Sequence, residues 1–300
     1  MVDRSKKLTT HSDYIKQLND NLFYEEIEIN SSDVLFVIDM QNDFVDRPYS
    51  ENGKRHKSGK LPTHNSKRII PSIIKLVKKF KKNEAMVVAT RDYHTKLKHH
   101  CSFPIFGEHC VIGSKGSDFV DLVPEIEKEL IKKNKFQKNC QVVYKADNPK
   151  IDSFGAFPYT KKLGKNRICG CTENKCPVHF TGSWGLSKWS RYPKMKNIKK
   201  IKINKIIKDV SKKNDYVFIC GVLGDFCVLD TARNARAAGY KNVVVVIDLI
   251  RNLRIKEKGK ITYPTSPAAF NKEANKHGFS FILSKDIKHG FSFILSKDIK

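Results

Sequence analysis

The feature that most constrains the fold is a series of largely apolar runs that recurs along the chain. Each run has the length of one strand, and an unbroken apolar run is typical of a strand buried on both faces of a sheet. The runs are DVLFVID (33–39), AMVVATRD (85–92), QVVYKA (141–146), YVFICGV (216–222), NVVVVID (242–248) and FSFILS (279–284).

Segments with helical spacing of apolar residues lie between these runs. They cover residues 66–83, 117–134, 225–240 and 267–278, and Ser66 is the expected N-cap of the first. Alternating strands and helices predict an α/β protein with a six-stranded, mostly parallel sheet and helices on both faces. In such sheets, binding and catalytic residues gather at the carboxyl ends of the strands.

Two segments depart from this alternation. Residues 158–205 contain many Lys, Gly and Cys, and we interpret them as an insertion. The C-terminus carries HGFSFILSKDIK twice, at 277–288 and 289–300, and a repeat array needs about three copies, so we assign the second no function. We therefore expect a polar N-terminal segment (1–30), one domain (31–288) and a duplicated tail (289–300).

The chain is strongly basic, with 57 Lys and Arg against 31 Asp and Glu and a formal charge of +26. A charge of this size is compatible with nucleic-acid binding. The basic runs are dispersed and mostly lysine, however, and no nucleic-acid-binding motif occurs. Solvated helix faces are the favoured interpretation, and we expect no specific nucleic-acid partner.

The eight cysteines are expected to be reduced thiols. The N-terminal residues are polar and lack the apolar core of a signal peptide. No apolar run approaches the roughly 18 residues of a membrane span. These features favour a cytoplasmic protein, with the nucleus as an alternative and no membrane partner, and they leave a homo-oligomer open.

Histidines are concentrated directly after the second apolar run. Asp92 and His94 stand two residues apart in an extended segment, which places their side chains on one side, and His100 and His109 follow in the next loop. One carboxylate with two or three imidazoles is a ligand set for Zn²⁺, Fe²⁺ or Mn²⁺. The spacing alone is compatible with a metal site and equally with solvated loop histidines.

Other polar groups follow other strands, namely Asp39, Lys145 and Cys227. A helix N-terminus and a nearby lysine would lower the pKa of the Cys227 thiol, and an aspartate beside it would accept its proton. The alternative is that Cys227 is a small buried side chain without a catalytic role.

Five motifs, in this order and spacing, resemble those of the nicotinamidases, which are isochorismatase-like cysteine hydrolases. The resemblance implies the three-layer isochorismatase-like fold and a hydrolase that converts nicotinamide to nicotinate and ammonia in NAD salvage. It covers about residues 33–157 and 215–285. The motifs are VIDMQNDF (37–44), Asp92-x-His94 with His100 and His109, YK (144–145), DSFGAF (152–157) and GVLGDFCV (221–228).

The resemblance implies a catalytic triad of Asp39, Lys145 and Cys227, in which the thiolate attacks the amide to form a thioester. Backbone N–H groups of Leu223 and Cys227 would form the oxyanion hole, beside a cis peptide between Val222 and Leu223.

The resemblance also implies one divalent metal ion that holds the pyridine nitrogen of the substrate, with Zn²⁺ first and Fe²⁺ or Mn²⁺ as alternatives. Its ligands map to Asp92, His94 and His109, and His100 matches a further ligand of some members. His99 is interpreted as a solvated neighbour, although an exchange of roles with His100 stays open.

Three phenylalanines, Phe44, Phe106 and Phe226, either line the ring pocket or pack in the core. Leu223 departs from the family pattern, which commonly has alanine there, and a leucine facing the pocket would crowd the ring.

The insertion is a second departure. It contains a C-x-C-x4-C-x2-H pattern, which is either a second, structural zinc site or a loop of reduced thiols. The residues of this pattern are Cys169, Cys171, Cys176 and His179.

Two other functions stay open at this point. Another amidase or isochorismatase-type hydrolase would share the fold, but members acting on non-pyridine substrates generally lack these metal ligands. A basic nucleic-acid-binding protein without catalysis would not need Asp39, Lys145 and Cys227 together. Salt-sensitive binding to random nucleic acid would identify it.

Overall fold

A computed structural model of the 300-residue chain gives the structure. It describes residues 11–18, 22, 25–95, 100, 102–120, 140–146, 154–157, 215–253, 255–257, 260–262 and 265–290. The candidate zinc ligands Cys169, Cys171, Cys176 and His179 lie outside the described residues, as do the rest of the predicted insertion, His99 and the tail from residue 291.

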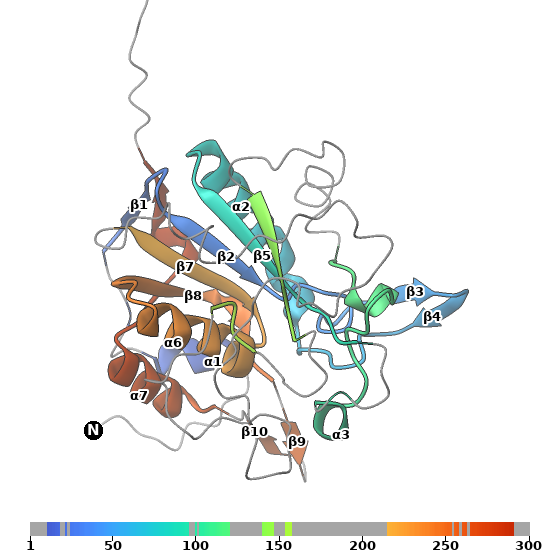
Figure 1. Ribbon diagram of the computed structural model, residues 1–300. Coiled ribbons are helices and arrows are strands. Elements are labelled where there is room, and N and C mark those ends of the chain that lie inside the picture. The colour runs from blue at the N-terminus through green and yellow to red at the C-terminus, as the bar shows by residue number, and fades with distance from the viewer. Residues whose placement is uncertain are drawn as a thin grey trace, which may run out of the picture.

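The predicted sheet is confirmed. Within the described residues it has six strands, all parallel to their neighbours (Figure 1). Their order across the sheet is β11 (Ser280–Ile282), β8 (Asn242–Arg251), β7 (Tyr216–Val222), β2 (Val34–Ile38), β5 (Met86–Asp92) and β6 (Cys140–Lys145).

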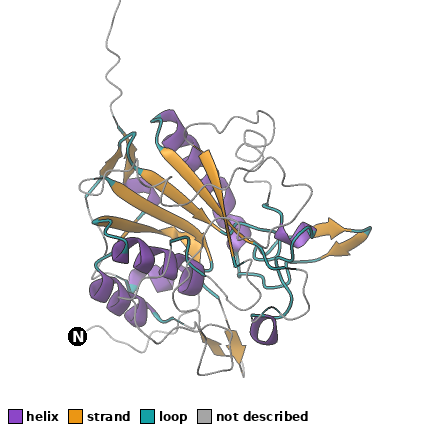
Figure 2. Ribbon diagram, in the orientation of Figure 1, coloured by secondary structure: helices purple, strands orange, loops and turns teal. Residues whose placement is uncertain are grey.

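Helices cover both faces of this sheet, as the alternating pattern predicts (Figure 2). On one face, α2 packs its buried side chains against alternate residues of the central strands, including Leu35 and Val37 of β2. Phe36 and Ile38 point to the other face, where α1, α6 and α7 lie. The α-helices among the described residues are α1 (His11–Lys16), α2 (Ile70–Lys82), α3 (Phe103–Phe106), α6 (Leu229–Ala237) and α7 (Pro267–His277).

Short strands and turns surround the main sheet. In the part of the chain that the structure describes, these strands form three pairs, of which β1 and β12 run parallel and the other two antiparallel. The pairs are β1 (Ile27–Ile29) with β12 (Ile287–His289), β3 (Tyr49–Glu51) with β4 (Lys54–His56), and β9 (Ile255–Glu257) with β10 (Lys260–Thr262). Short 3-10 turns cover Ser66–Ile69, Lys115–Ser117 and Ser284–Asp286.

The start of the second repeat takes part in this fold. His289 completes β12 beside Ile29, and the Asn83 side chain lies 3.2 Å from its Nδ1 atom. Gly290 then passes so close to β1 that a Cβ atom there would lie 2.2 Å from the carbonyl oxygen of Ile29.

Two local predictions are wrong. Ser66 is not the N-cap: its hydroxyl donates to the Thr63 carbonyl (2.6 Å), and a 3-10 turn that follows Asn65 leads into α2. The helix predicted over residues 117–134 does not begin at residue 117. Phe119 instead forms an antiparallel bridge with Gln41, because Phe119 and Val120 are both buried against the chain that leaves β2. Residues 121–134 lie outside the described part.

No helix among the described residues combines the length and apolar character needed to cross a membrane.

The stability of the sheet depends on Gly221, where β7 passes β2. Its φ is 113°, and a Cβ atom there would lie 2.2 Å from the Ile38 carbonyl oxygen. We expect Gly221→Ala to lower the free energy of unfolding by about 3 kcal/mol or more, measured by urea denaturation. Gly53 (φ 75°) is the control, because a Cβ atom there meets nothing within 4 Å; Gly53→Ala should cost about 1 kcal/mol. Equal losses would contradict the packing argument.

Candidate active site and metal centre

The carboxyl ends of four neighbouring strands bring the predicted site residues together. Asp39 follows β2, Asp92 ends β5 and Lys145 ends β6, while Cys227 lies in a π-helix (Gly224–Val228) directly after β7. All four side chains are buried. The site therefore forms where parallel α/β sheets usually place one.

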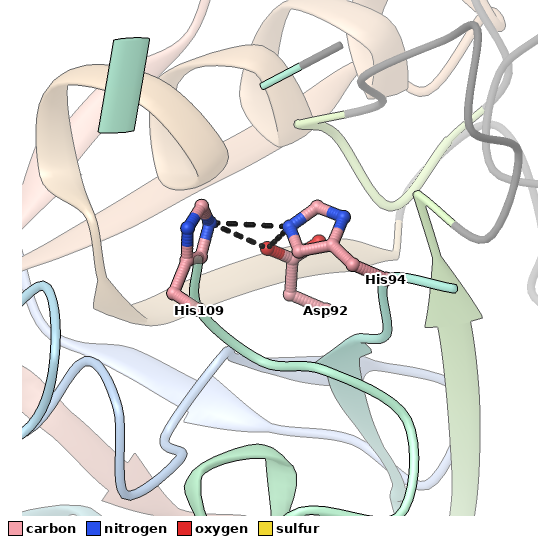
Figure 3. A group of neighbouring side chains, drawn as sticks. All are labelled: Asp92, His94 and His109. Atoms are coloured by element: carbon pink, nitrogen blue, oxygen red, sulfur yellow. Dashed lines mark hydrogen bonds and ion pairs between the residues drawn. The ribbon is translucent and has the colours of Figure 1, made fainter. Parts of the chain in front are cut away.

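Three candidate ligands converge beside this group. Nε2 of His94 lies 3.0 Å from Oδ2 of Asp92 and 3.1 Å from Nε2 of His109, and the His109 atom lies 3.6 Å from the same oxygen (Figure 3). Ligand atoms around a tetrahedral zinc ion with bonds of about 2.0 Å lie about 3.3 Å apart. The three atoms therefore have the spacing that one metal ion requires.

The backbone behind the two imidazoles favours the same interpretation. Nδ1 of His109 lies 2.8 Å from the Gly107 carbonyl oxygen, and Nδ1 of His94 lies 3.2 Å from that of Ala146. A carbonyl oxygen can only accept, so Nδ1 of His109 carries the proton and Nε2 of His109 keeps its lone pair toward the centre of the group.

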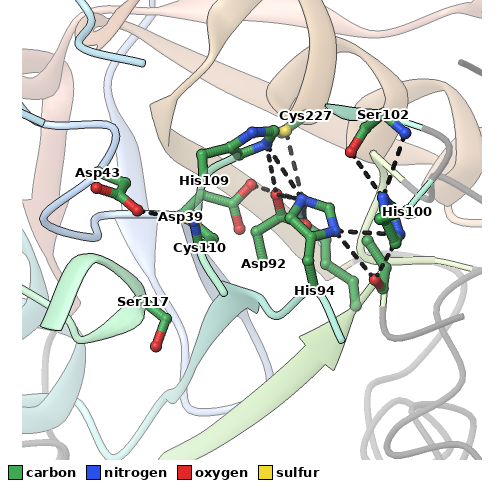
Figure 4. Close-up of polar contacts among 12 residues, drawn as sticks. Asp39, Asp43, Asp92, His94, His100, Ser102, His109, Cys110, Ser117 and Cys227 are labelled. Atoms are coloured by element: carbon green, nitrogen blue, oxygen red, sulfur yellow. Dashed lines mark hydrogen bonds and ion pairs between the residues drawn. The ribbon is translucent and has the colours of Figure 1, made fainter. Parts of the chain in front are cut away.

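His100 is placed differently from the other predicted ligands. Its Nε2 lies 3.1 Å from Nδ1 of His94 and 3.1 Å from the Ala146 carbonyl oxygen, on the side of His94 that faces away from His109 (Figure 4). Its Nδ1 lies 2.7 Å from the Ser102 hydroxyl. Burial lowers the pKa of His100 to about 3. In this geometry His100 is a buried, neutral support for His94.

Lys145 connects the candidate metal ligands to the candidate nucleophile. Its Nζ lies 2.8 Å from Oδ2 of Asp39, 3.2 Å from Oδ1 of Asp92 and 3.5 Å from Sγ of Cys227. Burial opposes a charge on this amine, but the two carboxylates outweigh it and raise the pKa of Lys145 well above its usual range. Lys145 is therefore a buried ammonium group held between two carboxylates.

The pKa values of the two carboxyls diverge, although both contact Lys145. Burial raises the pKa of Asp39 despite the lysine. Burial also acts on Asp92, but the interactions with His94 and Lys145 overcome it and hold the pKa of Asp92 well below its usual range. Asp39 is thus the better proton acceptor, and Asp92 is the better permanent anion.

The predicted lowering of the Cys227 pKa is wrong. Burial raises the pKa of this thiol well above its usual range, Lys145 partly offsets that effect, and Asp39 and Asp92 add to it. The prediction considered only the helix and the lysine and left out burial and the carboxylates. The resting side chain is a thiol whose proton has a neighbouring acceptor, because Cys227 is within hydrogen-bonding reach of the Asp39 carboxyl.

The turn before Cys227 has an unusual backbone. The peptide bond between Val222 and Leu223 is cis, and the Leu223 carbonyl accepts from the N–H of Phe226 (3.2 Å) and of Val228 (3.0 Å). The Leu223 side chain is buried in the apolar cluster on the α2 face of the sheet. Thr231 donates to the Cys227 carbonyl (2.6 Å), which fixes the start of α6.

Two positioning residues in the first motif were missed by the sequence analysis. The Gln41 amide pairs with the backbone of Asp92, since its Oε1 accepts from the Asp92 N–H (2.8 Å) and its Nε2 donates to the Asp92 carbonyl (2.7 Å). Asp43 accepts from the N–H of Cys110 (2.8 Å), the residue after His109. The sequence offered one signal for them: both are polar residues within the VIDMQNDF motif.

The predicted phenylalanines lie in two places. Phe106 and Phe226 are half-buried and in ring contact with each other (5.7 Å between centroids), and Phe154, which the sequence analysis missed, contacts both. Phe106 also faces the His109 ring (6.3 Å). Phe44 is almost fully buried in the α2-side cluster and reaches His109 from there (5.4 Å).

Metal binding should separate the direct ligands from their support. We expect His94→Ala and His109→Ala to retain no stoichiometric zinc after dialysis, measured by metal analysis. We expect His100→Ala to bind zinc about 10- to 100-fold more weakly, as when a supporting contact is lost. His64→Ala, at an exposed position, is the control. Complete loss of zinc in His100→Ala would show that His100 is itself a ligand.

Asp225, in the π-helix before Cys227, should give a pH-dependent stability. Burial raises its pKa to about 7, although its carboxylate accepts from the Leu253 N–H (2.8 Å). The native state therefore holds this proton more tightly than the unfolded chain, and stability is lost as the pH rises from about 4 through the raised pKa. We expect Asp225→Asn to gain stability relative to the wild type between pH 5 and pH 8 in denaturant titrations. A difference that does not change with pH would contradict this.

Comparisons with known proteins show which fold this chain shares. The isochorismatase domain model matches residues 33–139, and no curated protein matches the sequence. PnC1 from L. infantum in complex with nicotinate is 21% identical with a TM-score of 0.58, over 88% of this chain and 99% of that chain. Pyrazinamidase of Pyrococcus horikoshii in complex with zinc is 21% identical with a TM-score of 0.51, over 84% and 99%.

The yeast nicotinamidase Pnc1p is 22% identical with a TM-score of 0.52, over 83% of this chain and 99% of that chain. At these identities the likeness shows the fold. This chain therefore has the isochorismatase-like fold, and its residues 33–139 match the isochorismatase domain model.

Proposed function

We propose that this protein is a metal-containing nicotinamidase that hydrolyses nicotinamide to nicotinate and ammonia. The observation that carries the proposal is the position of Lys145, whose ammonium group contacts Asp39, Asp92 and Cys227 at once. Through Lys145, the Cys227 thiol and its proton acceptor Asp39 are therefore connected to Asp92, one of the three candidate metal ligands. An amide carbon placed over the thiol and a ring nitrogen placed toward the histidines would use both halves of the site.

The chain's own residues supply the steps of the reaction. The Asp39 carboxylate takes the proton of the Cys227 thiol, and the charge of Lys145 stabilises the thiolate that results. The thiolate attacks the amide carbon, and backbone N–H groups of Leu223 and Cys227 stabilise the oxyanion. Asp39 returns the proton to the departing ammonia, and water then hydrolyses the thioester to nicotinate.

The metal ligands in this proposal are Asp92, His94 and His109, with zinc as the first candidate and Fe²⁺ or Mn²⁺ as alternatives. A divalent cation held there supplies a Lewis-acidic centre for the pyridine nitrogen. Asp92 keeps its negative charge because its pKa is held well below the usual range, and Gln41 fixes the backbone that carries it. These residues orient the substrate and do not take part in the proton transfers.

The aromatic residues complete the proposed pocket. Phe106 lies beside His109, and the half-buried rings of Phe154 and Phe226 contact Phe106, which suits a planar heteroaromatic substrate. Phe44 and Leu223 are buried in the core cluster, so we assign them to the floor behind the pocket. The proposed enzyme is cytoplasmic, acts in NAD salvage and needs no nucleic-acid partner.

Ammonia release from nicotinamide tests the proposal. We expect the zinc-loaded protein to release ammonia, and we expect at least a 1,000-fold loss in Cys227→Ala, because the nucleophile is then absent. Cys220→Ala is the matched control: the same change at a buried cysteine of β7 should leave turnover within about threefold of the wild type. Removing the metal should also abolish release, with activity restored by added zinc.

Two outcomes would contradict the proposal. If the folded, zinc-loaded protein releases no ammonia from nicotinamide but hydrolyses another amide through Cys227, the chain is a different isochorismatase-like hydrolase. If it hydrolyses no amide and instead binds random nucleic acid in a salt-sensitive way, its basic surface carries the function.

A further inference from the structure

A buried hydroxyl group contacts the proposed proton acceptor at two atoms. Thr90 lies near the end of β5 and is fully buried. Its Oγ1 accepts from the backbone N–H of Asp39 (3.0 Å) and lies 2.7 Å from Oδ1 of the Asp39 carboxylate.

The hydrogen-bond directions follow from the chemistry of the groups. A backbone N–H can only donate, so it fills an acceptor position of the Thr90 oxygen. The single hydroxyl proton is then left for Oδ1 of Asp39, which can only accept when ionised. Oδ2, the oxygen that faces Lys145 at 2.8 Å, stays available for a second proton donor.

The backbone explains why Asp39 needs this support. The parallel ladder between β2 and β5 pairs residues up to Val37 and Ala89, and the chain then turns out of the strand. Asp39 itself has a φ of 47°, which is rare for a residue with a side chain. The Thr90 hydroxyl therefore replaces the lost ladder contact and also fixes the rotation of the carboxylate.

We propose that Thr90 is a positioning residue that aims the Asp39 carboxylate at the Cys227 thiol. In this role Thr90 touches neither substrate nor thiol and acts through Asp39 alone. Its kinetic consequence rests on the proposed nicotinamidase function, but its effect on the thiol does not. The same geometry makes Oδ2 of Asp39 the atom that receives the thiol proton.

The test compares Thr90→Val, which removes the hydroxyl at nearly constant shape, with Thr90→Ser, which keeps it. The first readout needs no substrate: the rate at which iodoacetamide alkylates Cys227 at one neutral pH, followed on the Cys227 peptide by mass spectrometry. We expect the alkylation rate to fall at least about 10-fold in Thr90→Val. In Thr90→Ser we expect it to stay within about threefold of the wild type.

The second readout is nicotinamide turnover. We expect kcat to fall about 10- to 100-fold in Thr90→Val with KM within about threefold, because proton transfer is affected and ring binding is not. Thr90→Ser should restore kcat. If the wild type does not turn over nicotinamide, the proposed function fails, and the alkylation comparison still decides the role of Thr90.

Two controls separate this role from general damage. Zinc content should be unchanged in Thr90→Val, because Gln41 holds the backbone of Asp92 independently of Thr90. In an Asp39→Asn background, Thr90→Val should cause no further loss of alkylation rate, since the group it aims is already gone. If Thr90→Val does not fold, Thr90→Ala takes its place. Wild-type alkylation in a folded variant without the hydroxyl, or a further loss in the Asp39→Asn background, would overturn the proposal.

Discussion

A buried ammonium group is the constraint on which the rest of the site depends. Removing the charge of Lys145 from water is costly, and it is tolerated only because two carboxylates lie within 3.2 Å of Nζ. Those carboxylates come from the ends of two other strands, so the β2–β5–β6 order of the sheet is needed to assemble them. The same arrangement gives the carboxyls different tasks. Asp92, with His94 on its far side, stays an anion. The effect of burial on Asp39 exceeds that of the lysine, so Asp39 retains a raised pKa and can hold a proton.

The surroundings of this ion group are built from polar contacts to backbone. Gln41 pairs with the main chain of Asp92, Asp43 holds the N–H next to His109, and Gly107 and Ala146 offer carbonyl oxygens to the two candidate ligands. Side-chain orientation therefore depends on loops whose own conformations are fixed by buried hydrogen bonds. Such preorganisation costs folding energy but removes the need to reorganise during reaction.

Much of the fold could be predicted from the sequence, because apolar runs define buried strands and parallel strands collect polar groups at one end. The sequence also indicated that Asp39, Asp92, Lys145 and Cys227 would meet. It did not reveal the role of Thr90, which stands in an apolar run as an ordinary strand-forming residue and bonds to a residue 51 positions away. The pKa of Cys227 was predicted in the wrong direction for the same reason. Burial and the carboxylates of Asp39 and Asp92, which are far from Cys227 in the sequence, outweigh the effect of the local helix. The helix expected from residue 117 does not form there, because Phe119 is buried against the chain leaving β2.

The contact of Gly290 with β1 has a consequence for how the two C-terminal repeats divide. By sequence identity the boundary falls between residues 288 and 289, yet His289 belongs to β12 and Gly290 fits where no side chain could. The first two residues of the second copy, His289 and Gly290, are therefore part of the folded unit. Truncation after residue 288, at the boundary between the two copies, would remove the last residue of β12 and disrupt its pairing with β1. Truncation after residue 290 would leave the β1–β12 pair complete.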